Sequence, residues 1–238
     1  MKVDLSTPNL ALMSIFRHPN QIITLDANFL IPPDRRAITP HFFDFDRFKT
    51  VWLEPIFKAF PNLAIHEAVY EELISSSIQA YIQEKLNSIP CRVIIHSDLS
   101  LNNEEKALRN TIESKIYPYT KYEPMIDNKD DRGEVKSLAY IAVKELIFFA
   151  AHDHNVLQLI EKAELWSTGL DNIQAIKMYE LIFYLYKMNI GDKKSLRMLY
   201  KYQYYLTQNE KKENPEWGEF IERMELLYSR ETIINVKL

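Results

Sequence analysis

The sequence predicts an α/β protein with three layers, in which a central, mainly parallel β-sheet lies between helices and extra helices follow at the C-terminal end. Two observations predict this fold. Short, apolar runs that could form buried strands alternate along the chain with longer segments whose apolar residues follow helical spacing. Strands that alternate with helices are typical of a parallel sheet covered on both faces. The chain has 238 residues, of which 47% are hydrophobic, so it can bury a large core.

Four apolar runs are expected to form strands. Two of them, IITL and LIFFAA, end immediately before polar residues, Asp26 in the first case and His152-Asp153 in the second. β-Branched and aromatic residues are frequent in the four runs, as is usual for buried strands. The expected strands are residues 22–25, 62–65, 91–96 and 146–151.

Eight segments are expected to be helical, because their apolar residues recur at helical spacing. Pro61 and Pro90 end two of them, since proline cannot continue a helix. The expected helices are residues 44–60, 67–87, 102–116, 131–145, 155–163, 171–188, 192–206 and 215–229. We predict one domain over residues 1–206 and a helical extension, packed on it, over residues 207–238.

Composition limits the location and the partners of the protein. The net charge of −4 argues against a general nucleic-acid-coating protein but leaves room for a local basic patch. Cys91 is the only cysteine, so no intramolecular disulfide can form, and a reducing, cytoplasmic location is expected. No apolar run approaches the roughly 20 residues that span a bilayer, so no membrane association is expected.

Acidic residues follow the expected strands or occupy the first turns of the helices after them. Each has a local explanation. Asp26 could form a turn with its own backbone, and Asp153 could cap the helix that follows it. Asp131 and Glu134 have the spacing of a helix cap and its N3 partner. Glu72, with its neighbour Glu71, could lie on a solvated helix face.

Taken together, these acids indicate a metal site. The carboxyl ends of parallel strands meet at one edge of the sheet, where ligands bind. Carboxylates gathered at that edge repel one another, and a hard divalent cation relieves the repulsion. Oxygen ligands favour Mg²⁺ or Mn²⁺, and no group of His and Cys has the spacing of a zinc site.

Four pieces of the chain, in order, resemble the acidic motifs of PIN domains, a family of metal-dependent nucleases that act mostly on RNA. These pieces are LDANFLI, VYEEL, DRGEVKSLAYIAVKE and LIFFAAHDHNV, and the stretch LWSTGLDNIQAIKMYELIFYLYKMNIGD resembles the closing strand and helix of the family. The resemblance covers about residues 20–206. The long loop 118–130 and the HDH sequence around the fourth acid depart from the family pattern.

The resemblance implies a role for each acid. It makes Asp26 the first acid and Glu72 the second, with Glu71 as the rival for that place. Asp131 and Glu134 share the third motif, and Asp153 is the fourth acid.

The resemblance also implies a reaction, the metal-assisted hydrolysis of phosphodiester bonds in single-stranded RNA. Asp26, Glu134 and Asp153 would hold Mg²⁺ or Mn²⁺, and Asn28 would support the site. Arg132 would meet charge on the phosphate, or else is a solvated arginine at the helix start. The alternatives are a weak or inactive PIN fold that binds RNA or protein, and the toxin of a toxin–antitoxin pair with an inhibitory protein partner. A homodimer is a further option.

A basic stripe lies near the C-terminal end. Lys193, Arg197 and Lys201 share one face of the expected helix, and residues 187–212 hold seven Lys or Arg against two acids. Four tyrosines interleave them, as in sites for single-stranded nucleic acid. The alternative is a solvated helix face with its tyrosines on the core and its charge neutralised by the acids that follow. The tyrosines are Tyr200, Tyr202, Tyr204 and Tyr205.

Overall fold

The computed structural model describes residues 2–40 and 43–229, which divide into two compact units. We call them the sheet unit and the helical unit. The sheet unit comprises Ile22–Ile31 and Pro61–Ile176. The helical unit comprises Met1–Gln21, Pro32–Phe60 and Lys177–Leu238. Residues 230–238, which belong to the expected C-terminal extension, lie outside the described residues.

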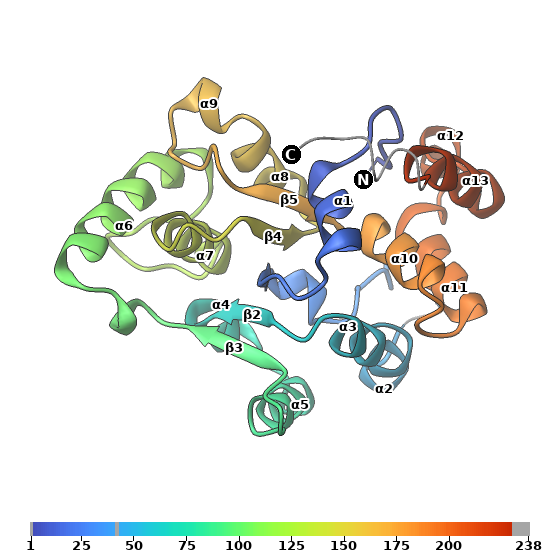
Figure 1. Ribbon diagram of the computed structural model, residues 1–238, viewed down its shortest axis with the longest axis horizontal. Coiled ribbons are helices and arrows are strands. Elements are labelled where there is room, and N and C mark those ends of the chain that lie inside the picture. Colours follow the sequence, from blue (N-terminus) through green and yellow to red (C-terminus); the bar gives the residue numbers. More distant parts are fainter. Residues whose placement is uncertain (1, 41–42, 230–238) are drawn as a thin grey trace. The chain divides into compact units, whose positions relative to one another are not determined.

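A five-stranded parallel sheet forms the centre of the sheet unit and confirms the predicted fold class (Figure 1). The strand order is β3-β2-β1-β4-β5. The chain adds β2 and then β3 on one side of β1, and it then adds β4 and β5 on the other side of β1. The switch point, where ligands bind in such sheets, therefore lies between β1 and β4. The strands are β1 (Ile23–Leu25), β2 (Leu63–His66), β3 (Val93–His96), β4 (Phe148–Ala151) and β5 (Gln174–Lys177).

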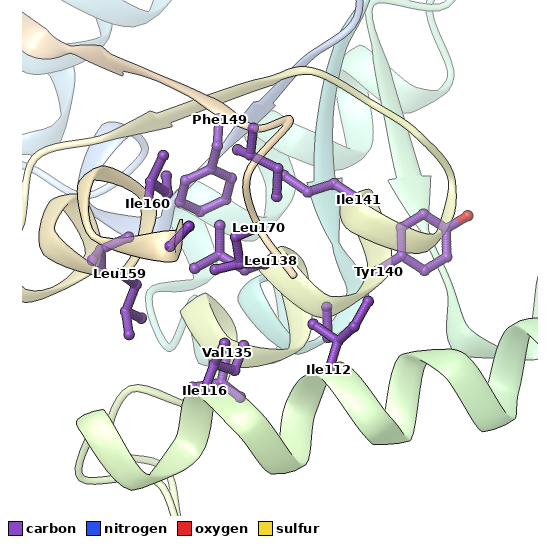
Figure 2. Close-up of a cluster of buried hydrophobic side chains, with 14 of the residues drawn as sticks. Ile112, Ile116, Val135, Leu138, Tyr140, Ile141, Phe149, Leu159, Ile160 and Leu170 are labelled. Atoms are coloured by element: carbon purple, nitrogen blue, oxygen red, sulfur yellow. The ribbon is translucent and has the colours of Figure 1, made fainter. Parts of the chain in front are cut away.

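Helices of the sheet unit connect and flank these strands. They are α4 (Glu67–Glu72), α5 (Ser76–Leu86), α6 (Asn103–Ile116), α7 (Arg132–Val143), α8 (His154–Glu161) and α9 (Ala163–Trp166), with short 3₁₀ turns η1 (Ala27–Phe29), η3 (Asp98–Ser100) and η4 (Tyr117–Tyr119). The hydrophobic core packs α7 between its neighbours. Figure 2 shows Ile112 and Ile116 of α6 directed toward α7, with Val135 of α7 beside Ile116 and Phe149 of β4 in the same cluster. Each large apolar side chain buried there contributes about 1.5–3 kcal/mol, so α7 is firmly held.

Two predicted helices of this part of the chain are wrong in their extent. The helix predicted over residues 67–87 is interrupted at Leu73–Ser75, because the serines around position 75 favour a helix start over a helix interior. The segment 171–188 begins as β5 and becomes helical only at Met178. Gln174 N–H donates to the Ile147 carbonyl oxygen at 2.7 Å, so pairing with the neighbouring chain segment overrides the helical pattern.

The helical unit is built around α10 (Met178–Lys187), whose first eight residues are all buried. A helix that is buried on nearly every side lies in a core. The segment predicted as one helix over 44–60 is continuous, with a π turn in its middle. The other elements are α1 (Leu10–Arg17), α2 (Phe45–Phe48), η2 (Lys49–Leu53), α3 (Glu54–Ala59), α11 (Lys193–Tyr204), α12 (Gln208–Glu213) and α13 (Trp217–Leu227). Among the described residues, no helix has the length and apolar character needed to cross a bilayer.

Candidate active site

Asp26 is the innermost of the predicted acids. It follows β1 directly, and none of its surface is exposed. Ala27 N–H donates to Asp26 Oδ1 at 2.7 Å, and Asn28 Nδ2 donates to Oδ2 at 3.0 Å. The Asp26 backbone N–H donates to the Ala150 carbonyl oxygen of β4 at 3.0 Å, at the switch point. Asp26 is therefore a turn cap and a buried carboxylate at once, and Asn28 holds its Oδ2 by a hydrogen bond.

Glu134 and Asp153 approach Asp26 from two other elements. Glu134 lies in the first turn of α7, and Asp153 caps α8 by accepting a hydrogen bond from Asn155 N–H at 2.7 Å. Burial raises the pKa of Glu134, and the charge of Asp26 raises it further, with smaller effects from Asp131 and Asp153. Burial also raises the pKa of Asp26. The chain thus brings together acids that are more than 100 residues apart in sequence, all within the sheet unit.

Glu72 joins the same group through α7. Gly133 N–H donates to Glu72 Oε1 at 2.8 Å, and a Cβ placed on Gly133 would lie 2.8 Å from Oε2. Only glycine fits this close approach. Burial and then the charge of Glu134 raise the pKa of Glu72 to about 7. Glu71, the rival for this position, is exposed and pairs with Arg132 instead.

Asp131 lies at the start of α7 but does not cap it. Its backbone is left-handed, with φ of 54°, and its Oδ2 accepts a hydrogen bond from Lys121 N–H at 2.9 Å. The capping pair considered for Asp131 and Glu134 does not form. The Asp131 charge still contributes to the raised pKa values of Glu134 and Glu72, so Asp131 belongs to the acidic group electrostatically.

Arg132 is paired with two carboxylates, and its contact with a phosphate stays a prediction. Its Nη2 lies 2.7 Å from Glu71 Oε2, and its Nε lies 3.2 Å from Asp127 Oδ1. Asp127 also accepts hydrogen bonds from Tyr122 Oη and Lys136 Nζ, both at 2.7 Å. Arg132 therefore helps to fasten the loop 118–130 to α7. A contact between Arg132 and a substrate would compete with these two ion pairs.

A second polar group, not predicted, occupies the ends of β2 and β3. Ligand atoms of His66, Glu67 and Asp98 lie within 4.8 Å of one another. His66 Nδ1 accepts a hydrogen bond from Ala68 N–H at 3.1 Å, so the ring proton is on Nε2, which lies 3.3 Å from Asp98 Oδ1. Arg109 Nη2 lies 3.1 Å from Asp98 Oδ2.

Both ring nitrogens of His66 are thus engaged and a cation is already present, which fits an internal ion network better than a metal centre. One signal in the sequence could have indicated it. His66 and His96 each end a strand of the parallel sheet, and the two residues are register partners.

The basic stripe forms on α11 of the helical unit as the sequence spacing predicts. Arg197 Nη2 and Lys201 Nζ lie 3.8 and 3.6 Å from Glu216 Oε1, and Lys193 Nζ lies 4.6 Å from the Tyr186 ring centroid. One of the acids that follow the stripe thus neutralises part of its charge. The interleaved tyrosines are buried, except for the half-buried Tyr205, so they are core residues rather than stacking surfaces. Nucleic-acid binding by the three cations stays a prediction.

A cation at the acidic group stays a prediction, since the ligand atoms that lie within 4.8 Å of one another among the described residues are those of His66, Glu67 and Asp98. All donors of the acidic group are oxygens, they come from the ends of two adjacent strands and from α4 and α7, and they carry carboxyl groups that are hard to ionise together. Comparisons of the chain with family models, with curated proteins and with solved structures give no match.

Proposed function

We propose that the chain is a PIN-type, metal-dependent nuclease that hydrolyses phosphodiester bonds of single-stranded RNA. The observation that carries the proposal is the burial of Asp26 beside Glu134 and Glu72 at the switch point of the parallel sheet. An isolated buried carboxylate costs several kcal/mol, and close like charges add to that cost. Without a bound ligand, the burial of Asp26 beside Glu134 and Glu72 would only lower the stability of the fold.

Asp26, Glu134 and Asp153 would hold Mg²⁺ or Mn²⁺. The fit rests on the donor set, which is all oxygen, and on the burial and neighbouring carboxylate charges that raise the pKa values of Asp26 and Glu134. When bound, the cation supplies a Lewis acid and a bound water of lowered pKa.

The residues of the chain orient this site. Ala27 and Asn28 fix both Asp26 oxygens, and Gly133 fixes Glu72 Oε1. Such fixed donors reduce the reorganisation needed at the moment of reaction.

The first prediction concerns catalysis. Asp26→Asn keeps the side-chain shape but removes a ligand charge, so cleavage of single-stranded RNA with Mn²⁺ should fall by at least about 100-fold, the effect of losing a key electrostatic group. Glu72→Gln should also reduce cleavage, whereas its neighbour Glu71→Gln should not. The measurement is the single-turnover rate on a labelled RNA, with chelator as the blank. Equal rates for wild type and Asp26→Asn would show that the activity belongs to another protein or another site.

A second candidate function is binding without cleavage, either of RNA or of a protein partner. Arg132 favours it, because this arginine at the acidic group is already paired with Glu71 and Asp127. A toxin held by an inhibitory protein would have the chemistry of the first proposal. If Mn²⁺ raises the melting temperature of the wild type and no RNA is cut, the binding function is supported.

A further inference from the structure

A pocket of about 430 Å³ lies on the helical unit, lined by residues of α2, α11 and the segments beside them. Four of the residues that line the pocket are mainly apolar, and we call them its floor: Phe43, Met198, Tyr202 and Leu206. The rings of Phe43 and Tyr202 pack edge to face, with centroids 4.9 Å apart, and both residues are buried. The floor is therefore formed before any ligand arrives.

The other four lining residues, which we call the rim, are cations, and no acidic residue lines the pocket. They are Arg47, Lys194, Arg197 and Lys201. The Arg47 guanidinium lies 5.0 Å from the Phe43 ring centroid and also contacts the Met198 sulfur, which places it at the edge of the floor.

The charge of this rim is only partly balanced. Arg197 and Lys201 share one carboxylate, Glu216, at 3.8 and 3.6 Å, and long, exposed pairs of this kind are weak. Within the described part of the chain, no carboxylate forms an ion pair with the side chain of Arg47 or Lys194. Asp44 and Asp46 nevertheless line an adjoining hollow together with Arg47 and Lys194, so they balance part of the charge of these two cations. The pocket thus combines an apolar floor with an excess of positive charge.

We propose that this pocket docks an acidic segment of a partner protein, with an apolar side chain of the partner on the floor and its carboxylates against the four cations. An apolar anchor within a polar rim is the usual arrangement of a binding hot spot, and an amphipathic helix in a groove presents both. Complementary charge speeds the encounter, and the flexible Met198 side chain adapts to the anchor. The inference does not depend on the nuclease proposal.

The observations favour a peptide over RNA. Sites for single-stranded nucleic acid offer exposed ring faces on which bases stack, whereas Phe43 and Tyr202 are 5% and 6% exposed. The apolar surface open to a partner's side chain is therefore mainly that of the half-buried Met198 and Leu206. Phosphates gain nothing from an apolar floor.

Three probes distinguish these ligands. The first is a short, fluorescent, helical peptide with Leu and Phe on one face and Glu and Asp elsewhere. The second has the same charge but Gln in place of Leu and Phe, and the third is a short single-stranded RNA, measured with chelator. Anisotropy titrations of the full chain should show binding of the first peptide at least about tenfold tighter than binding of the second, as expected for a buried apolar anchor.

Variants then assign the binding to the pocket. Lys194→Glu with Arg197→Glu should weaken binding of the first peptide by about tenfold or more and reduce its salt dependence. Lys193→Glu is the matched control, since Lys193 is on the same helix but does not line the pocket. Met198→Gln should reduce the preference for the first peptide over the second. Far-UV circular dichroism checks that the variants fold, and Lys194→Gln is the milder replacement if the double variant does not.

Three results would overturn the proposal. Equal binding of the two peptides would reduce the pocket to a general anion site. Tighter binding of the RNA, lost with Lys194→Glu and Arg197→Glu, would make it a nucleic-acid site. Absence of binding by the first peptide would leave no docking function for the pocket.

Discussion

Asp26 carries two roles that the sequence alone presents as alternatives. As a cap it accepts the Ala27 N–H, and as a buried acid it has the charge of Glu72 nearby. The position of Asp26 directly after an apolar strand makes it recognisable in the sequence. The two roles are not separable there, since both place a carboxylate at the same position. Burial and long-range neighbours, which only the folded chain reveals, decide that the acid is more than a turn residue.

The second prediction concerns the stability of the metal-free protein. Asn at position 26 caps about as well as Asp and removes one of the repelling charges. Asp26→Asn should therefore raise the unfolding free energy in chelator, by about 1–3 kcal/mol, the scale of a close like-charge pair in partial burial. A cation at 100 times its Kd should stabilise the wild type by about 2.7 kcal/mol and the variant by far less. Thermal melts in Mn²⁺ and in chelator measure both effects. If millimolar Mn²⁺ leaves the melting temperature of the wild type unchanged, this would argue against a metal at Asp26.

Helices α4 and α7 are in contact at Gly133, where the absence of a side chain leaves room for the carboxylate of Glu72. The Gly133 N–H bonded to Glu72 makes the first turn of α7 part of the site. The pattern of apolar residues predicted α7 almost to its ends, because α7 has a strong core face. The same pattern missed α1 and the interruption before α5, since periodicity does not report where local caps or neighbouring segments compete with a helix.

The third prediction concerns this contact between helices. Gly133→Ala should move Glu72 out of the acidic group, since the added Cβ would lie 2.8 Å from its Oε2. The gain in helix propensity, up to about 1 kcal/mol, should largely offset the lost hydrogen bond, so stability should change little. Cleavage and the Mn²⁺-induced shift should both fall. Gly218→Ala is the control, because a Cβ there meets nothing within 4 Å. Unchanged activity in Gly133→Ala would remove Glu72 from the site.

Each of the two units buries carboxyl groups whose pKa values are raised. In the helical unit, burial raises the pKa of Glu180 to about 7, although Asn9 Nδ2 donates to its Oε2 at 2.9 Å. In the sheet unit, Asp26, Glu72 and Glu134 behave in the same way. A carboxyl group whose pKa is higher in the folded chain binds more protons there than in the unfolded chain at intermediate pH. Its contribution to stability is therefore lost as pH rises from its unfolded pKa to its folded pKa.

The fourth prediction follows from these pKa shifts. Metal-free protein should be more stable at pH 5.5 than at pH 8, by about 3 kcal/mol, given about 1.4 kcal/mol per unit of pKa and a discount for screening. His96, whose pKa burial lowers to about 4, opposes this trend below pH 6.5. Urea unfolding at the two pH values measures the difference. Glu180→Gln should reduce the pH dependence without changing the Mn²⁺ effect, and a stability that rises with pH would contradict the assignment.

The course of the chain through the two units sets the order in which they can be completed during synthesis. All five strands and all the predicted acids have been synthesised once residue 177 has emerged, whereas the helical unit still lacks α10, its most buried helix. Domains fold as units, beginning with those synthesised first. The first two segments of the helical unit, which precede or interrupt the sheet unit in sequence, must therefore remain without their core while the ribosome makes the acidic site. These two apolar segments are therefore exposed for the longest time during synthesis, and they are where we expect a chaperone to bind the nascent chain.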